Sequence, residues 1–392
     1  SDTEDGTSHS NIRVSNNASG IENRVINSND SNLRPAVLVS RNNANSPNGI
    51  HVHGLLKIDS VKITSWNPER NDVIRFNYGK RAGEEQTKSA YDTAEPRPFI
   101  RISSDATGTT NITNSELAYL GYSCSKCSGL SYYGGEGSVV RGNDIHHLLK
   151  GFYSNGMGNM VIEENKFHDN YLYGIDPHTA THDMIIRNNK VYDNNASAII
   201  CSKHCYNILI AGNEIHNNEQ RGIAFSINTT NSTAHNNYIH DQKTCIGSNR
   251  ASGNNKIYDN QLSDCEIGIS LGDSSNNIVN QNHIKNVTFA IVIENATNII
   301  EKNRIVDAKN GMVYFVPLAR NSSVTEVNYV PIDINSDKYE NTLTYMSKNN
   351  LFSNTTNSTL VLTQFVNNID DIPRIVQQNN ALMIENLTED SE

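Results

Sequence analysis

The sequence predicts an all-β chain that winds into a right-handed parallel β-helix, a solenoid of short stacked strands. Similar segments begin at Gly151, Gly174, Ala198 and Gly222, a spacing of 23 or 24 residues. Within each segment, β-branched and aromatic residues alternate with polar ones in short runs bounded by Asn, Gly and Ser, which is the period of a strand. A short strand unit at a fixed period can bury its apolar side only by stacking on copies of itself.

A recurring Asn supports this fold and argues against the alternatives. The run I-x-x-N-x-[IVF]-x-x-N occurs at 162–170, 186–194 and 210–218. Stacked coils lie about 4.8 Å apart, so Asn side chains at one position are expected to form ladders that satisfy buried backbone groups. No segment keeps a helical apolar period over several turns. Propeller repeats are about twice as long, and a β-sandwich does not repeat with this fidelity.

The extent of the repeat sets the expected domain limits. Weaker copies precede and follow the four clear ones. We expect an N-terminal cap and first coil or coils in 1–47, the β-helix itself in 48–314 and a capping segment in 315–392, because the ends of a solenoid need covering. Segment 78–98 interrupts the period and is expected to be a long loop that overhangs a binding groove.

Composition excludes several classes of function. A formal net charge of −10 argues against a general nucleic-acid binder, although a few local cations could hold an anionic substrate. No run of 18 apolar residues is present, so no membrane span is expected. N-x-[ST] sequons, among them Asn111 and Asn195, favour a secreted or cell-surface protein. We expect a monomer.

Cysteine and metal signals are weak. Cys124 and Cys127 form a CxxC pair that fits a local disulfide, free thiols or half of a zinc site, and no second CxxC follows. No column of three carboxylates suggests a catalytic Ca²⁺. We therefore expect no cofactor and no catalytic metal, and a structural Ca²⁺ stays open. A column of ring side chains is interpreted as a polar ladder on the outer face: His168, Tyr192, His216 and His240.

One stretch, YLYGIDPHTATHD at 171–183, gathers proton-handling groups. Aligning the coils places Ile175 in the inward column with the apolar residues of neighbouring repeats. Asp176 and His178 then lie together on the outward side of one strand. Tyr173 precedes this strand, and the alignment leaves open whether it points inward or, after a turn, outward. The side chains expected to surround the pair and bind substrate are Tyr133, Lys150, Tyr153, Asn155, Arg221 and Arg250.

This collection of groups suits an anionic polysaccharide. Solenoids bind long polymers along one face, and cations beside an acid/base pair suit a uronic acid. The proton on C5 of a uronate becomes acidic once the carboxylate is neutralised, and its removal gives an enolate-like intermediate that needs a fixed cation or hydrogen-bond donor. An epimerase then needs a second group that returns a proton to the opposite sugar face.

The hexapeptide YGIDPH, from Tyr173 to His178, resembles the signature of mannuronan C-5 epimerases, right-handed parallel β-helix enzymes that convert mannuronate to guluronate within a polymer. The similarity in repeats covers roughly 48–314, and its specific part is the hexapeptide with its flanks. The resemblance implies that Tyr173 and His178 are the acid/base pair on opposite sides of the sugar. It also implies that Asp176 positions or polarises His178 and that Lys203 neutralises the uronate carboxylate.

The chain departs from the family pattern at two positions. Lys203 stands where bacterial periplasmic enzymes carry Arg, and Lys lacks the planar fork of a guanidinium. Thr179 stands where the family often has an acidic residue. We expect an epimerase that converts β-D-mannuronate to α-L-guluronate in a polyuronate. The alternatives are a polyuronate lyase acting by β-elimination in the same groove and a non-catalytic carbohydrate-binding β-helix. A glycoside hydrolase needs two carboxylates across the sugar, and only Asp176 is well placed.

Overall fold

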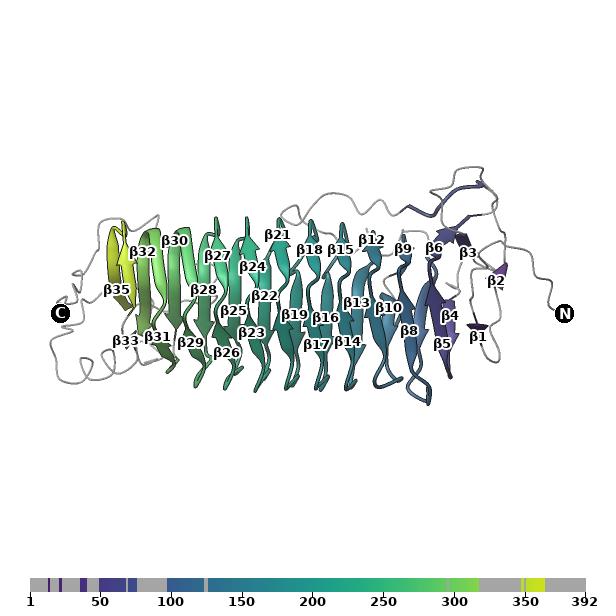
Figure 1. Ribbon diagram of the computed structural model, residues 1–392, viewed down its shortest axis with the longest axis horizontal. Coiled ribbons are helices and arrows are strands. Elements are labelled where there is room, and N and C mark those ends of the chain that lie inside the picture. Colours follow the sequence, from purple (N-terminus) through teal and green to yellow (C-terminus); the bar gives the residue numbers. More distant parts are fainter. Residues whose placement is uncertain are drawn as a thin grey trace, which may run out of the picture.

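The strands stack in chain order along one long axis (Figure 1). The computed structural model describes residues 49–67, 70–75, 97–122, 126–294, 296–316 and 350–363, with strand segments at 13–14, 21–22, 36–40 and 347–348. Every regular element within these residues is a strand. The loop expected at 78–98 falls almost entirely outside the described residues, as do most of the caps expected in 1–47 and 315–392.

Each coil contributes one strand to each of three faces, and the strands of a face pair in parallel from coil to coil. The first face consists of β4 (Gly49–Val52), β7 (Phe99–Ile102), β10 (Gly129–Tyr132), β13 (Lys150–Asn155), β16 (Ile175–His178), β19 (Ile199–Ser202), β22 (Arg221–Ser226), β25 (Thr244–Asn249) and β28 (Ile267–Gly272). The second face consists of β5 (Leu56–Asp59), β8 (Thr110–Thr113), β11 (Val139–Arg141), β14 (Val161–Glu163), β17 (Ile185–Arg187), β20 (Leu209–Ala211), β23 (Thr233–His235), β26 (Lys256–Tyr258), β29 (Ile278–Asn280), β31 (Ile299–Glu301) and β33 (Ser347–Lys348).

The third face closes each coil. It consists of β6 (Lys62–Trp66), β9 (Glu116–Ala118), β12 (Asp144–His146), β15 (Lys166–His168), β18 (Lys190–Tyr192), β21 (Glu214–His216), β24 (Tyr238–His240), β27 (Gln261–Ser263) and β34 (Leu351–Ser353). Two long strands, β30 (His283–Glu294) and β32 (Arg304–Val316), run from the third face into the first without a break and pair with each other. β32 also pairs with the last strand of the stack, β35 (Asn357–Thr363).

At the amino-terminal end the pairing changes direction. β1 (Arg13–Val14) pairs antiparallel with β5, and β2 (Ile21–Glu22) pairs antiparallel with β3 (Ala36–Ser40). β3 in turn pairs in parallel with β6. None of the described residues forms a helix long and apolar enough to cross a membrane.

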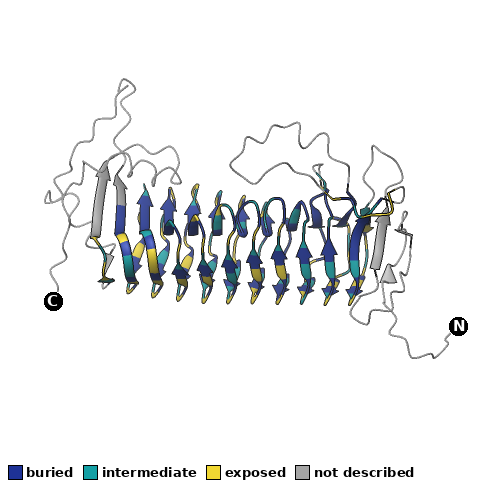
Figure 2. Cartoon of the chain, turned by 90° about the horizontal axis from the view of Figure 1, so that it is seen from above, coloured by how far each residue is buried: buried dark blue, intermediate teal, exposed yellow. Residues whose placement is uncertain are grey.

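The core is a set of inward columns, as the repeat predicts. Phe152, Ile175, Ile199 and Ile223 pair with one another from coil to coil, and each side chain is fully buried. Buried residues, dark blue in Figure 2, recur from coil to coil along the solenoid. The predicted all-β parallel helix is therefore confirmed, and the fold presents the alternate residues of each first-face strand on the other side.

The predicted Asn ladders are also confirmed. In the longest, each side-chain amide donates to the carbonyl oxygen of the next at 2.9–3.0 Å through Asn143, Asn165, Asn189, Asn213, Asn237, Asn260, Asn282, Asn303 and Asn350. All of these side chains are buried. Each amide oxygen also accepts a backbone N–H of the preceding coil, as Asn213 does from Asn189 at 2.9 Å. The ladder therefore satisfies turn backbone groups that would otherwise be buried without partners.

The predicted ring column lies on the third face and is longer than expected. His146, His168, Tyr192, His216 and His240 stack with centroid separations of 5.0, 4.8, 5.1 and 5.0 Å. These spacings repeat the coil rise of about 4.8 Å. The column lies on a different face from Asp176 and His178, so it belongs to the scaffold around the candidate site.

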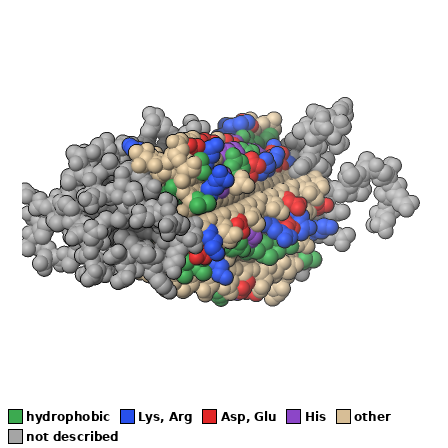
Figure 3. Space-filling model, turned by 60° about the vertical axis from the view of Figure 1, so that its left-hand side comes forward, with side chains coloured by type: hydrophobic (Ala, Val, Ile, Leu, Met, Phe, Trp, Pro, Cys, Tyr) green, Lys and Arg blue, Asp and Glu red, His purple; other side chains and the backbone are tan. Residues whose placement is uncertain are grey.

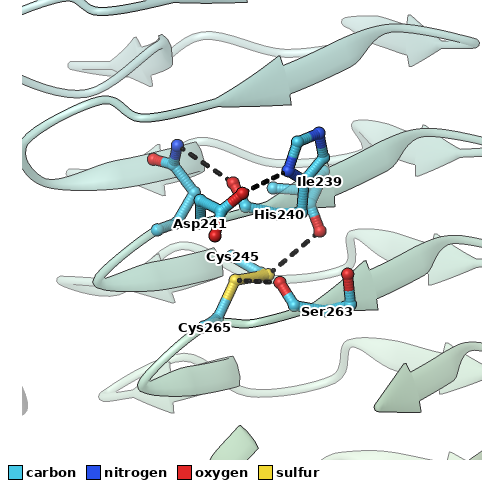
Figure 4. Close-up of a disulfide and its surroundings, with 7 residues drawn as sticks. Ile239, His240, Asp241, Cys245, Ser263 and Cys265 are labelled. Carbon is cyan, nitrogen blue, oxygen red and sulfur yellow. Dashed lines mark hydrogen bonds and ion pairs between the residues drawn. A yellow bond between two sulfur atoms is a disulfide. The ribbon is translucent and has the colours of Figure 1, made fainter. Parts of the chain in front are cut away.

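A disulfide that the repeat pattern does not predict joins two neighbouring coils. Cys245 and Cys265 are bonded, and Figure 4 shows the pair between the strands that carry His240 and Ser263. Cys127 of the CxxC motif is also disulfide-bonded. Cys201 and Cys205 are free thiols buried in the core. Burial raises the pKa of the Cys205 thiol to about 12, so this thiol stays protonated near neutral pH.

Candidate active site

The proton-handling residues meet on the first face, at strands β13 and β16. Ile175 anchors β16 in the core, so alternation places Asp176 and His178 on the other side of the strand. The register pairs Tyr153 with Asp176 and Asn155 with His178, as the coil alignment predicts. Parallel pairing at about 4.8 Å brings these four side chains into one cluster.

A buried ion pair occupies the centre of this cluster. The ammonium Nζ of Lys150 lies 2.7 Å from Oδ2 of Asp176. Asp176 is 1% exposed and the Lys150 side chain 17% exposed, so the pair is largely shielded from water. Burial raises the pKa of the Asp176 carboxyl, and the charge of Lys150 opposes that rise. The other carboxylate oxygen, Oδ1, is buried and has no hydrogen-bond partner among the described residues.

Two phenol rings flank the Lys150 ammonium. Its Nζ lies 4.3 Å from the centroid of Tyr153 and 5.5 Å from that of Tyr173, within the range of cation–π attraction. Tyr173 is partly exposed and lies on the side of β16 that carries Asp176. The orientation that the sequence left open is thereby settled: Tyr173 turns away from the core and toward the cluster.

His178 is held through one ring nitrogen. Its Nδ1 lies 2.7 Å from the hydroxyl of Thr179 and 3.4 Å from the hydroxyl of Tyr153, which also accepts a hydrogen bond of 3.3 Å from the amide of Asn155. No hydrogen bond to Nε2 occurs among the described residues. Partial burial lowers the pKa of His178, the charge of Asp176 opposes this, and the charges of Lys150 and Lys203 add to the lowering. The ring is therefore neutral at pH 7, with Nε2 available.

Of the two roles that the resemblance implies for Asp176, positioning His178 by a hydrogen bond and polarising it by charge, the contacts fit the second. Its carboxylate pairs with Lys150, and no hydrogen bond joins Asp176 to His178 in the described part of the chain. The orientation of the imidazole comes from Thr179 and Tyr153, while Asp176 contributes through its charge, which raises the pKa of His178. Thr179, which departs from the family pattern, thus has a direct contact with the imidazole.

The remaining predicted cations lie on later coils. Lys203 is exposed one coil beyond Thr179, in a left-handed turn conformation with φ of 59°. Arg221 begins β22, two coils beyond Tyr173, and its side chain lies over Gly247. Arg250 is exposed three coils beyond Thr179, about 14 Å along the axis. Lys203 is therefore the nearest of the three to His178.

Sequence reasoning missed two cations on the other side of the cluster. Arg101 and Lys126 lie against the ring of Tyr133, with charged groups 5.6 and 5.2 Å from its centroid. The Tyr133 ring packs against Tyr153 at 5.8 Å between centroids. Arg101 lies in the outward column of Tyr153, with Ser131 between them. The register of β10 shifts between Gly129 and Ser131, so the regular coil alignment does not lead back to Arg101, and Lys126 lies in a turn that the repeat does not describe.

The charge changes sign toward the carboxyl-terminal end of the first face. Asp273 lies one coil beyond Arg250, and Glu294 lies one coil beyond Gly272 in the column of His178. Burial and the nearby Asp273 raise the pKa of Glu294 to about 7. Figure 3 shows basic and acidic side chains on both sides of a band of other atoms along the side of the molecule that it draws.

Two cavities of the solenoid lie away from this cluster, and the cluster has no set of metal ligands among the described residues. These cavities, of about 130 and 420 Å³, lie at the turns between the third and first faces, and neither is lined by Asp176 or His178. In the described segments, no group of three or more His, Cys, Asp or Glu side chains is placed to hold a metal ion. The arrangement offers instead a neutral imidazole, a phenol and a charged pair at one exposed surface, which is a set of groups suited to proton transfer.

A family model matches most of the solenoid. The model described as "Right handed beta helix region" matches residues 100–247 and 179–326, which together span more than half of the chain. This description agrees with the handedness that the sequence predicts. The structure of the periplasmic alginate epimerase AlgG shares the fold, with a TM-score of 0.57, 22% identity, and coverage of 82% of this chain and 77% of that chain.

Curated relatives match a shorter region. Mannuronan C5-epimerases of Pseudomonas putida and Pseudomonas fluorescens are each 27% identical to this chain over 141 residues, covering 33% of it. The match spans about a quarter of the length of these relatives, 24% in each case. The resemblance to mannuronan C-5 epimerases that the hexapeptide predicts is confirmed by these names, at low identity.

Proposed function

The chain belongs to the right-handed β-helix family, and from this premise we propose that it is a polysaccharide C-5 epimerase that converts β-D-mannuronate to α-L-guluronate within a polyuronate. One observation carries the proposal: a neutral imidazole and a phenol flank a buried ion pair on one exposed strand face. His178 and Tyr173 are the proton-transfer groups. Lys150 lies against the ring of Tyr173 and is paired with Asp176, and the charges of both act on His178. The names of the curated relatives and of AlgG support the same reaction.

The lowered pKa of His178 assigns its role in the proposal. A neutral imidazole with a free Nε2 accepts the C5 proton, and the electron pair of the broken C–H bond moves into the carboxyl group as an enolate. Tyr173 donates its phenolic proton to C5 from the opposite sugar face. Proton exchange with water then restores the imidazole and the phenol, so the cycle consumes no cofactor.

Stabilisation of the enolate falls to a cation that is not already neutralised. Lys150 is paired with Asp176 at 2.7 Å, so its field at the substrate is partly cancelled. Lys203 is exposed on the next coil and forms no ion pair within the described residues. Its position supports a direct contact with the uronate carboxylate, by a single ammonium rather than by a planar fork.

The proposed location is outside the cytoplasm. The Cys245–Cys265 disulfide and the bonded Cys127 favour an oxidising compartment, because structural disulfides are rare in the cytosol. An anionic polysaccharide is also a typical extracytoplasmic substrate. We propose a secreted or periplasmic carbohydrate-binding enzyme that acts as a monomer.

Side-chain replacements at the cluster test the proposal. Polymannuronate is incubated with the unmutated protein and with His178→Gln, Tyr173→Phe and Lys203→Gln, and proton NMR measures the guluronate fraction. We expect guluronate from the unmutated protein and a loss of at least about 100-fold in the first two variants. His216→Gln, on the ring column of the third face, is the matched control and should retain full activity.

Two other outcomes would overturn the proposal in different ways. An unsaturated product with ultraviolet absorbance, without guluronate, would show a polyuronate lyase. Binding of polyuronates without any change in the polymer would show a non-catalytic carbohydrate-binding β-helix. Full activity of His178→Gln would leave the epimerase in place but would remove this cluster as its active site.

A further inference from the structure

Arg101 and Lys126 are two cations that form no ion pair among the described residues, although a hydrogen bond with His53 and also the charge of Arg101 lower the pKa of the exposed Asp105. Both cations lie against the ring of Tyr133, at 5.6 and 5.2 Å from its centroid. Among the described residues neither has an ion-pair partner, whereas Lys150 is paired with Asp176. Neither cation therefore has to break an ion pair before it can bind an anion.

Unpartnered buried atoms lie in the same column. Ser131 pairs in register with Arg101 on one side and Tyr153 on the other, and it is fully buried. The hydroxyl of Ser131 and the Nε of Arg101 are both buried without hydrogen-bond partners in the described residues. The hydroxyl of Ser131 is out of reach of a bound ligand, whereas Arg101 is partly exposed and can present its guanidinium to one.

The outward column that contains Arg101 leads to the proposed active site. It continues from Arg101 through Ser131 and Tyr153 to Asp176, one coil per step. Arg101 therefore lies three coils, about 14 Å, before Asp176 along the axis. A polymer that lies along the first face with its reacting sugar at His178 places its neighbouring sugars over this column.

The donor set suits a carboxylate. A guanidinium offers a planar fork that matches both carboxylate oxygens, and an ammonium and a hydroxyl supply further donors. Burial raises the pKa of the Tyr133 phenol, which therefore keeps its proton as a donor. The side chains of Arg101, Lys126 and Tyr133 all donate, and none of the three carries a negative charge.

We propose that Arg101, Lys126 and Tyr133 form a second carboxylate-binding subsite, which holds a uronate of the same polymer on the amino-terminal side of the reacting sugar. This subsite, called the Arg101 subsite below, rests on the proposed function for its substrate class. It contributes to binding of the polyuronate at a position remote from the reacting carbon. It also requires an oligomer long enough to reach β7.

Calorimetric titration with oligomannuronates of increasing length tests the Arg101 subsite. The matched probes are uncharged mannose oligomers of the same lengths. We expect Arg101→Gln to weaken binding of long oligomannuronates about tenfold, the effect of losing one charged hydrogen-bonded contact. Lys126→Gln should weaken it less, because an exposed point charge is partly screened. Binding of the shortest oligomers should not change.

Two further variants control the result. Lys256→Gln removes an exposed cation of β26 on the second face and should leave every affinity unchanged. Arg101→Lys retains the charge and should recover part of the loss, while an unchanged melting temperature shows that each variant is folded. For polymer turnover, Arg101→Gln should raise KM about tenfold and leave kcat unchanged, because the subsite binds ground state and transition state alike.

The outcomes separate the subsite from the proposed reaction. Equal affinity of Arg101→Gln and the unmutated protein for long oligomannuronates would overturn the subsite, whatever the enzyme activity. Failure of the unmutated protein to bind any oligomannuronate would overturn it as well. Binding that weakens in Arg101→Gln, without any epimerisation by the unmutated protein, would support the subsite and refute the proposed reaction.

Discussion

Replacing Lys150 with Met isolates the buried ion pair beneath the candidate active site. Lys150 Nζ lies 2.7 Å from Asp176, whose side chain is 1% exposed. The Met side chain fills the volume of the Lys stem but leaves the carboxylate buried without its cation. We expect the protein to lose about 3 kcal/mol of stability, because removing one partner of a buried pair exposes the full desolvation cost of the other.

The size of the loss should depend on pH. Burial raises the pKa of Asp176 above its ordinary value, so the folded state favours the protonated carboxyl. Stability gained from that protonation is present at acid pH and is lost as the pH rises through the folded-state pKa. Without Lys150 this pKa rises further. The deficit of Lys150→Met should therefore be smallest near pH 4 and largest above pH 7.

Thermal unfolding of a double-mutant cycle measures the effect. A loss of about 3 kcal/mol corresponds to a fall of about 6 °C in Tm for a domain of this size. Lys150→Met combined with Asp176→Asn should regain most of the loss. The control is Lys190→Met, which breaks an equally short ion pair with Glu214, at 2.7 Å, whose partners are 54% and 38% exposed. This change should shift Tm by less than about 2 °C.

Either of two results would refute this reasoning. Unfolding of Lys150→Met at the same temperature as the unmutated protein across the pH range would mean that the pair is not desolvated in solution. A double variant as unstable as the single one would mean that the loss comes from packing rather than from an unpaired charge.

Three other changes probe the scaffold and the acidic end. Asn213→Ala removes four ladder hydrogen bonds of 2.9–3.0 Å and leaves buried backbone and amide groups unpaired, so denaturation should show a loss of at least about 3 kcal/mol; a loss below 1 kcal/mol would contradict the ladder's role. Cys245→Ser opens a disulfide that links residues 20 apart and should cost about 3 kcal/mol, visible as a lower Tm in non-reducing buffer; an unchanged Tm would be the contrary result. Glu294 has a pKa raised from 4.5 to about 7, so its contribution to stability is full below pH 4.5 and is lost as the pH rises through 7. Glu294→Gln should therefore raise Tm at pH 8 and leave it unchanged at pH 4.5, and an equal shift at both pH values would rule out titration as its cause.

The repeat was sufficient to predict which residues face inward. Ile175 and Ile199 occupy the core column that period-two alternation assigns to them, because parallel pairing keeps one register from coil to coil. The Asn ladders follow from the same register. These features depend on spacing alone, and the sequence contains the spacing.

The repeat could not predict how deeply the site residues are buried or which side chains they contact. Asp176 lies on the predicted side of β16, yet it is buried, because Lys150 and the rings of Tyr153 and Tyr173 gather over it. Alternation fixes the side on which a residue lies but not what covers it. The position of Tyr173 just before the strand also left its direction undetermined until the turn geometry was known.

Irregular coils concealed the remaining residues. The register of β10 shifts between Gly129 and Ser131, so the column that leads back to Arg101 does not follow the regular repeat. Cys245 and Cys265 lie in different columns, Cys245 within β25 and Cys265 in a turn, and aligning the repeats does not bring them together. Contacts of this kind depend on turns and bulges, whose conformations a repeat pattern does not specify.

Proton NMR of polymannuronate incubated with the unmutated protein in D₂O tests the central claim most directly. Removal of the C5 proton and return of another from the opposite face predict guluronate residues that carry deuterium at C5 and an otherwise intact polymer. Guluronate with its original C5 proton, or a polymer in which no C5 position has exchanged or inverted, would contradict proton transfer by His178 and Tyr173 as the function of this site.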